Sequence, residues 1–214
     1  RLPEKDRATC EFVVPTGNFG NVLAGWLAQR MGLPCGTFRV ATNQNDILYR
    51  FFTTGEYRQG DVHPSHAPSM DIQAASNFER FLYFILGEDS ARIREVMAQI
   101  KSGSPVKIDL PATTFRASRM DDETIVKATA QMWKDWHYVL DPHTACAFTD
   151  MAQDRVSIVL STASPAKFPD VVQQATGSEP THPTLEALKA KDMQRWPMDA
   201  TTDAVKAFIR AKKH

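Results

Sequence analysis

A short segment with two glycines and three polar side chains is the part of the sequence best suited to bind an anion. It reads Pro-Thr-Gly-Asn-Phe-Gly-Asn over residues 15–21. If a strand precedes this segment and a helix follows it, the free backbone N–H groups at the start of the helix converge on one point and can bind a phosphate. Glycine allows a close approach of the backbone, and Thr16, Asn18 and Asn21 add side-chain donors. The segment therefore predicts a phosphate site that needs no lysine or arginine.

Other interpretations of this segment are limited by its spacing. It matches neither G-x-x-x-x-G-K-[ST] nor G-x-G-x-x-G, which argues against a nucleoside triphosphate site and a dinucleotide site respectively. A tight structural turn is the remaining alternative, because two glycines are common between a strand and a helix.

The surrounding residues predict the elements that such a loop requires. A β-branched and aromatic run ends at Pro15, and apolar residues at helical spacing follow the loop. Because strands and helices alternate, we expect an α/β fold whose strands pair in parallel through right-handed crossovers. The first predicted elements are a strand over 11–14, a helix over 21–31, a strand over 37–41 and a helix over 46–54.

The remainder of the chain continues the alternation and becomes more polar toward its end. A second strand, small polar turn and helix follow one another around residues 161–165. The predicted elements are an irregular loop over 57–70, helices over 76–86 and 90–101, an extended stretch over 106–110, a helix over 121–136, a helix from Pro142 capped by Asp141, a strand over 156–160, a helix ending near 174 and a last helix over 202–212.

A second polar cluster follows the strand predicted over 37–41. It contains Asn43, Asn45 and Asp46. Ligands of open α/β sheets bind at the carboxyl ends of the strands, so these three residues are candidate ligand contacts.

The histidines and cysteines do not predict a metal centre. His63 and His66 have H-x-x-H spacing, but no third ligand accompanies them. His143 follows Pro142 and is expected in the first turn of a helix, where a backbone hydrogen bond is the simpler role than catalysis. The cysteines are three in number and widely separated, at Cys10, Cys35 and Cys146, which favours a reducing, cytoplasmic setting over a disulfide framework.

Composition excludes several classes of partner. The 214 residues carry 25 basic and 25 acidic side chains, so no net positive field attracts nucleic acid or an anionic membrane. No apolar run reaches the roughly 18–20 residues that a membrane span needs. With 43% hydrophobic and 23% charged residues, the chain is expected to fold as a globular unit.

Five motifs in the same order along the chain carry a family resemblance. They are Val-Pro-Thr-Gly-Asn-Phe-Gly-Asn (14–21), Ala-Thr-Asn-Gln-Asn-Asp (41–46), Ala-Pro-Ser-Met-Asp-Ile with Ser-Asn-Phe-Glu-Arg (67–72 and 76–80), Asp-Pro-His-Thr-Ala (141–145) and Ser-Thr-Ala-Ser-Pro-Ala-Lys-Phe (161–168). This series resembles threonine synthase, a pyridoxal-phosphate enzyme of the tryptophan-synthase-β-like fold (fold type II). One residue departs from the usual pattern, because Ser164 replaces a histidine.

The resemblance implies a reaction and a set of binding residues. Threonine synthases convert O-phosphohomoserine and water to threonine and phosphate in threonine biosynthesis, and the cofactor serves as an electron sink. By position, Thr162 would hydrogen-bond the cofactor's pyridine nitrogen, and Lys167 is a candidate for the substrate phosphate, although a solvated lysine on a helix explains it equally well. The residues expected around the cofactor phosphate are Gly17, Asn18, Phe19, Gly20 and Asn21.

The resemblance also implies that part of the enzyme lies outside this sequence. The Schiff-base lysine of the family occurs in a Phe-Lys-Asp context upstream of the phosphate loop, whereas Lys5 is the only lysine before the loop here. We therefore interpret residues 1–214 as the C-terminal part of a catalytic α/β domain with extra C-terminal helices. Without its N-terminal part, this carbon–oxygen lyase is expected to be inactive.

Other functions stay open at this stage. A protein similar to threonine synthase that binds pyridoxal phosphate or a phospho-ligand without turnover is one alternative, which the Ser164 departure favours. A pyridoxal-phosphate-dependent serine/threonine dehydratase or a cysteine synthase is another, although neither resembles the Met-Asp-Ile, Asn-Phe-Glu-Arg and Pro-Ala-Lys-Phe segments. A phosphate-binding module without enzymatic activity is a third.

Overall fold

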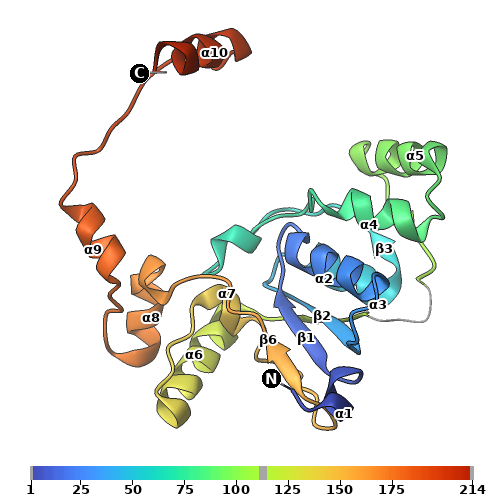
Figure 1. Ribbon diagram of the computed structural model, residues 1–214, viewed down its shortest axis with the longest axis horizontal. Coiled ribbons are helices and arrows are strands. Elements are labelled where there is room, and N and C mark those ends of the chain that lie inside the picture. Colours follow the sequence, from blue (N-terminus) through green and yellow to red (C-terminus); the bar gives the residue numbers. More distant parts are fainter. Residues whose placement is uncertain (1, 111–114, 213–214) are drawn as a thin grey trace. The chain divides into compact units, whose positions relative to one another are not determined.

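The computed structural model describes residues 2–110 and 115–212, which fall into two compact units divided between Pro180 and Thr181. The first unit contains a four-stranded sheet and most of the helices (Figure 1). The described part of the second unit contains two helices, α9 (Pro183–Lys189) and α10 (Thr202–Ala211). None of the helices formed by the described residues combines the length and apolar character that a membrane span requires.

All strands of the four-stranded sheet run parallel, in the order β5-β2-β1-β6. The strands are β1 (Glu11–Pro15), β2 (Thr37–Thr42), β5 (Phe115–Arg119) and β6 (Ser157–Val159). The predicted α/β class and the parallel pairing of the first two strands are thereby confirmed. Because the strands are parallel, their carboxyl ends lie at one edge of the sheet, where the 15–21 loop and the polar turn after β6 both begin.

One face of the sheet is covered by helices that share a large aromatic core. These helices are α2 (Gly20–Arg30), α3 (Ile47–Thr54) and α4 (Phe78–Ile85). The helix α5 (Ser90–Lys101) packs on α4 and adds apolar residues to the same core. Phe52 stacks on Phe115 of β5 with ring centroids 4.8 Å apart, and Phe51 meets Phe78 edge to face at the same distance. Such pairs add to the stabilisation from burial alone, so this core fixes α2, and with it the loop that leads into α2.

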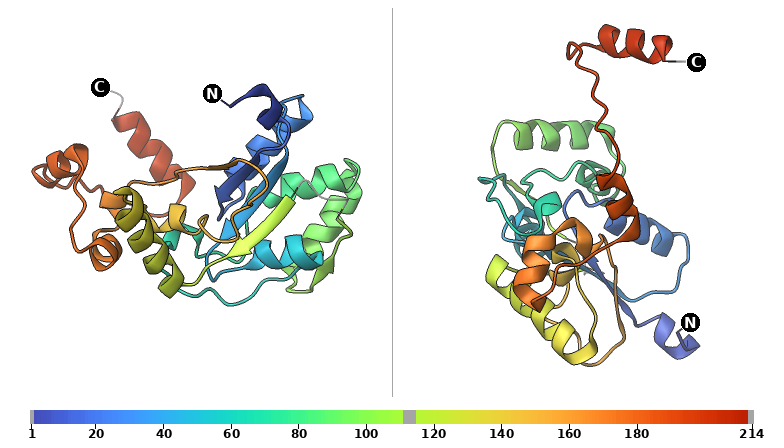
Figure 2. Two further views of the ribbon diagram at one scale, coloured as in Figure 1. Left: turned by 90° about the horizontal axis from the view of Figure 1, so that it is seen from below. Right: turned by 90° about the vertical axis from the view of Figure 1, so that its left-hand side faces the viewer.

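The other face is covered by α6 (Asp122–Trp136), α7 (Pro142–Ala145) and α8 (Pro169–Thr176). Val13, Ala41 and Val159 alternate with the residues of the aromatic face and pack here against Ala147. Figure 2 shows α6 and α8 beside one another on this side, in agreement with their contacts. Both faces of the sheet therefore carry helices, and the central strands β1 and β2 are mostly buried, as expected for parallel strands.

A buried ion pair ties the sheet to the chain that follows α7. The side chains of Arg39 and Glu11 are fully buried and lie 3.5 Å apart, Nε to Oε2. Arg39 also donates to the carbonyl oxygens of Ala147 and Thr149. Burial lowers the pKa of Arg39 from its ordinary value, although Glu11 opposes that shift. The segment after α7 is thus held against the sheet by charge-assisted hydrogen bonds.

Several elements were not predicted from the sequence. They are α1 (Glu4–Arg7), the strand β5, the short 3-10 helices η1 (Pro68–Met70) and η2 (Pro165–Lys167), the helix α9 and the strand β3 (Glu56–Tyr57), which pairs antiparallel with β4 (Val106–Lys107). The extended stretch expected over 106–110 contains β4. The helix expected from Pro142 exists with Asp141 as its cap, but it is a single turn.

Candidate active site

A cavity of about 180 Å³ lies at the carboxyl ends of β1 and β6. Several residues singled out from the sequence meet here, although they lie about 150 positions apart in the chain. Its lining consists of Pro15, Gly17, Asn21, Ser69, Met70, His143, Thr162, Ala163, Lys167 and Phe168. A second cavity of about 220 Å³ is lined by residues 15–21 and Asn77. The 15–21 loop contributes to both cavities.

The loop places the start of α2 against these cavities in the manner expected of an anion site. Phe19 is the N-cap residue with φ 65°, and no side chain caps the helix. The first N–H groups of an α-helix have no partner within the helix, so those of Gly20 and Asn21 are available to a ligand. The carbonyl oxygen of Phe19 accepts the N–H of Leu23 at 3.0 Å, which begins the helical ladder.

The side chain of Phe19 explains its unusual backbone. Its ring is 1% exposed and contacts the rings of Phe52, Phe78 and Phe81. A positive φ is unfavourable for a residue with a side chain, and aromatic burial offsets that cost here. Of the loop residues predicted to bind a ligand, Phe19 can therefore offer only its backbone.

A second segment closes on the loop and fixes its shape. A Cβ atom added to Gly17 would lie 2.7 Å from the carbonyl oxygen of Ser69. Asn18 accepts hydrogen bonds from Ser76 and Asn77 through its side-chain and backbone oxygens. Only glycine permits the approach at Gly17. The two glycines in the sequence predicted a close approach of the loop backbone, but they did not predict that the Ser69 segment is what it approaches.

Gly20 is less crowded than Gly17. A Cβ atom there would have the Nδ2 atom of Asn77 at 3.4 Å as its nearest neighbour. Asn77 in turn accepts a hydrogen bond from Arg80, 2.6 Å from Oδ1. The second cavity therefore has a guanidinium group close to one of its lining residues, a feature that the sequence analysis did not assign.

The turn formed by α7 lies behind the first cavity. His143 is 4% exposed, accepts the N–H of Ser69 on Nε2 at 3.1 Å and contacts the ring of Phe168, with centroids 4.7 Å apart. Its Nδ1 atom lies 3.3 Å from Oδ1 of Asp141. The expectation that His143 hydrogen-bonds backbone is confirmed.

Asp141 is nearly inaccessible to solvent and remains ionised. It accepts the backbone N–H groups of His143 at 3.0 Å and Thr144 at 3.2 Å, and also the hydroxyl of Thr144. Burial by itself raises the pKa of a carboxyl, but the hydrogen bonds from His143 and Thr144 outweigh it, and the pKa of Asp141 lies below 3.8.

Thr162 and Lys167 extend from the other wall. The backbone N–H of Thr162 donates to the hydroxyl of Thr144 at 3.1 Å, and the Thr162 side chain is exposed at the cavity. Lys167 is exposed as well, and within residues 2–110 and 115–212 it forms no salt bridge. An ammonium group is therefore available beside the start of α2.

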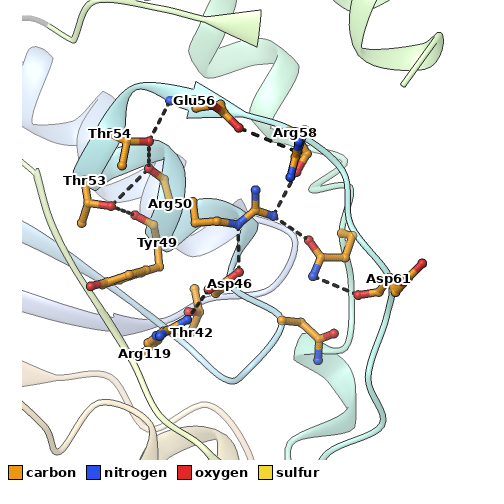
Figure 3. A network of polar contacts seen from close by, with 12 residues as sticks. Thr42, Asp46, Tyr49, Arg50, Thr53, Thr54, Glu56, Arg58, Asp61 and Arg119 are labelled. Atoms are coloured by element: carbon orange, nitrogen blue, oxygen red, sulfur yellow. Dashed lines mark hydrogen bonds and ion pairs between the residues drawn. The ribbon is translucent and has the colours of Figure 1, made fainter. Parts of the chain in front are cut away.

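The cluster after β2 lies apart from the first cavity, and its side chains bind other parts of the chain. Asn43 and Asn45 both donate to Oδ1 of Asp71, at 2.6 and 2.9 Å. Asp46 pairs with Arg50 at 2.9 Å and with Arg119 at 2.6 Å (Figure 3). These contacts favour a role in holding the 63–71 segment and α3 in place.

Metal-binding and thiol chemistry find no support at the site. The described residues contain no group of three or more histidine, cysteine or acidic side chains able to hold a metal ion. Cys146 is fully buried behind α7, and burial raises its pKa far above 9.0. The thiol is therefore unreactive in the folded protein.

Comparisons with known proteins show what this chain is similar to. Residues 143–209 match the family model "Threonine synthase, C-terminal". A threonine synthase of Methylobacillus glycogenes is 37% identical over 92% of this chain and 45% of its own length. A crystal structure described as pyridoxal-phosphate-bound threonine synthase from Brucella melitensis superposes with a TM-score of 0.85 at 35% identity, over 97% of this chain and 47% of that chain.

The chain is similar to the threonine synthases.

It is similar to their C-terminal part and spans about half the length of the curated relatives it matches. A "Threonine synthase-like 2" of Mus musculus is also similar, 35% identical over 89% of this chain. The structural similarity confirms the expected α/β fold with a parallel sheet.

Proposed function

We propose that this chain is the C-terminal part of a threonine synthase that binds pyridoxal 5'-phosphate and converts O-phosphohomoserine and water to threonine and phosphate. The observation that carries the proposal is the convergence of an uncapped helix N-terminus, a threonine hydroxyl and a free ammonium group on one pair of cavities. Similarity to threonine synthases over about half of their length supports the same conclusion.

The loop residues fit a phosphate group. Gly17, Asn18, Gly20 and Asn21 line the second cavity together with the backbone of Phe19. Their N–H groups stabilise a dianion by hydrogen bonds and by the helix dipole, without a cationic side chain. Since a Cβ atom at Gly17 would collide with Ser69, the loop keeps its shape only with glycine there.

The opposite wall fits the ring of the cofactor. We propose that the Thr162 hydroxyl hydrogen-bonds the pyridine nitrogen, because this side chain is exposed at the cavity. When bound, pyridoxal phosphate supplies an electron sink for carbanions formed on the substrate. A hydroxyl partner does not stabilise a positive pyridinium, so Thr162 leaves the ring nitrogen largely unprotonated.

Lys167 is the proposed partner of the substrate phosphate. It lines the same cavity as Gly17 and Thr162, at the first turn after β6. A single ammonium group attracts a phosphate dianion without imposing a fixed geometry. We assign Asn43, Asn45 and Asp46 a supporting role, because their side-chain hydrogen bonds go to Asp71, Arg50 and Arg119.

A further part of the same enzyme completes the site in this proposal. β6 lies at one end of the strand order, and beside it an apolar cavity of about 410 Å³ is lined by residues of β1, β6 and α2. We propose that the N-terminal part of the enzyme covers this surface and supplies the Schiff-base lysine, so that the present chain alone is inactive. The cavity is apolar, and exposed apolar surface of this kind is commonly covered by protein.

One alternative is supported by a specific residue. Ser164, in place of the family histidine, is the N-cap of η2 and adjoins Ala163 of the cavity wall. A protein of this family that binds the cofactor without forming threonine would fit that substitution, and a relative named "Threonine synthase-like 2" exists.

The cofactor site is tested by comparing pyridoxal 5'-phosphate with pyridoxal in the full-length protein. We expect pyridoxal 5'-phosphate to bind at least about a hundredfold more tightly, because the loop contacts only the phosphate. Equal affinities would remove the phosphate site from the proposal. Formation of a 2-oxo acid in place of threonine would favour a dehydratase.

A further inference from the structure

The single-turn helix α7, with its cap residue Asp141, contacts both walls of the first cavity. His143 accepts the N–H of Ser69, which belongs to the segment packed against Gly17. Thr144 accepts the N–H of Thr162, which lies in the turn after β6. Ser69 and Thr162 are 93 positions apart in the sequence. One short turn therefore fixes the separation of two segments that are remote in the chain.

The hydrogen bonds in this turn have defined donors and acceptors. The Thr144 hydroxyl donates to Oδ2 of Asp141, which leaves its lone pairs to accept the N–H of Thr162. His143 accepts the N–H of Ser69 on Nε2, and its own backbone N–H donates to Oδ1 of Asp141 at 3.0 Å. Asp141 therefore orients the Thr144 hydroxyl directly and holds the backbone of His143.

Burial makes these contacts difficult to replace. The exposed fractions are 1% for Asp141, 4% for His143 and 3% for Thr144. These side chains are nearly inaccessible to solvent, so a lost hydrogen bond leaves its partner unsatisfied. Thr129, which is equally buried, differs because its hydroxyl bonds only the carbonyl of Ile125 within the same helix.

We propose that Asp141 and Thr144 are positioning residues of the proposed threonine synthase. Through the N–H of Thr162 they hold the hydroxyl that meets the cofactor ring, and through His143 and Ser69 they hold the segment that shapes the phosphate loop. This inference rests on the proposed function, since it assigns a role toward a cofactor that the proposal places in the cavity. Neither residue contacts the cofactor itself.

Thr144→Val tests the inference in the full-length enzyme. Valine keeps the shape of threonine and removes the hydroxyl, whereas Thr144→Ser retains it. Thr129→Val is the matched control, because it deletes a buried threonine hydroxyl away from both cavity walls. The readouts are the dissociation constant for pyridoxal 5'-phosphate, the visible absorption spectrum of the bound cofactor and the melting temperature of the cofactor-free protein.

We expect Thr144→Val to weaken cofactor binding about tenfold and to shift the absorption maximum. Thr144→Ser should bind the cofactor within about threefold of the unaltered enzyme, and Thr129→Val should change neither the cofactor affinity nor the absorption spectrum. If Thr144→Val fails to fold, Asp141→Asn, which keeps the volume of the side chain and removes its charge, must show the same weakening. A Thr144→Val enzyme with unaltered affinity and spectrum overturns the inference alone, as does a change equal to that of Thr129→Val. Failure of the unaltered enzyme to bind the cofactor overturns the proposed function and the inference with it.

Discussion

Replacing Gly17 with alanine would place a methyl group against the backbone of a neighbouring segment. The added Cβ atom lies 2.7 Å from the carbonyl oxygen of Ser69 and 3.2 Å from Cα of Met70. Favourable contacts between carbon atoms begin at about 3.5 Å, so one of the two segments must move by up to about 1 Å. The Ser69 segment is held by the hydrogen bond to His143 and cannot yield without losing it. Overpacking of this kind costs about 1–3 kcal/mol.

The matched control is Gly20→Ala in the same loop. Its Cβ atom meets nothing closer than Nδ2 of Asn77 at 3.4 Å, an ordinary contact. Gly20 is also the first residue of α2, so the preference for alanine over glycine in helix interiors applies only weakly there. The structure therefore separates two glycines that have the same expected role in the sequence.

The assay measures unfolding by denaturant and the affinity for pyridoxal 5'-phosphate in the full-length enzyme. We expect Gly17→Ala to lower the free energy of unfolding by about 1–3 kcal/mol and to weaken cofactor binding at least about tenfold. Gly20→Ala is expected to change the free energy of unfolding by less than about 0.5 kcal/mol. If the two variants behave alike, the close approach at Gly17 does not shape the phosphate site, and the reasoning fails.

Three further predictions concern stability, pH and substrate binding. Gly55 and Gly87 both have positive φ, but only Gly55 of the two has a backbone oxygen 2.5 Å from an added Cβ atom. In denaturant unfolding, Gly87→Ala should therefore lower the free energy of unfolding by roughly 1 kcal/mol, and Gly55→Ala should lower it by more. Folding lowers the pKa of Asp141, so its contribution to stability is present at neutral pH and is lost as the pH falls through that lowered pKa. The difference in free energy of unfolding between the unaltered protein and Asp141→Asn should therefore shrink in acid. A difference that stays constant with pH would contradict this. In steady-state kinetics, Lys167→Gln should raise KM for O-phosphohomoserine about tenfold with little change in kcat. The control Lys134→Gln, on the exposed face of α6, should leave KM and kcat unchanged.

The elements with strong local signals could be predicted from the sequence. β1 and β2 are β-branched or aromatic runs bounded by proline or polar residues, and α2 has apolar positions at helical spacing. β5 could not be predicted, because Phe115-Arg-Ala-Ser-Arg119 alternates a few apolar residues with arginines and becomes a strand only by pairing with β2. Its identity depends on the sheet rather than on local propensity.

The candidate site could be predicted in part. The loop at residues 15–21, Thr162 and Lys167 carry recognisable motifs, and the structure brings them together. The roles of Ser69 and Thr144 depend on contacts between segments remote in sequence, and no local pattern indicates such pairs. Asn43 resembles a ligand contact because it follows a strand, yet its side chain is used to bind Ser65 and Asp71. Position at the edge of a sheet does not show where an amide points.

The most direct test of the proposed function is the product stoichiometry of the full-length protein supplied with pyridoxal 5'-phosphate and O-phosphohomoserine. Threonine and inorganic phosphate are quantified in the same reaction. The proposal predicts that the two products appear in equal amounts and that neither appears without the cofactor. Bound cofactor with no threonine formed, or phosphate released together with a 2-oxo acid, would contradict it.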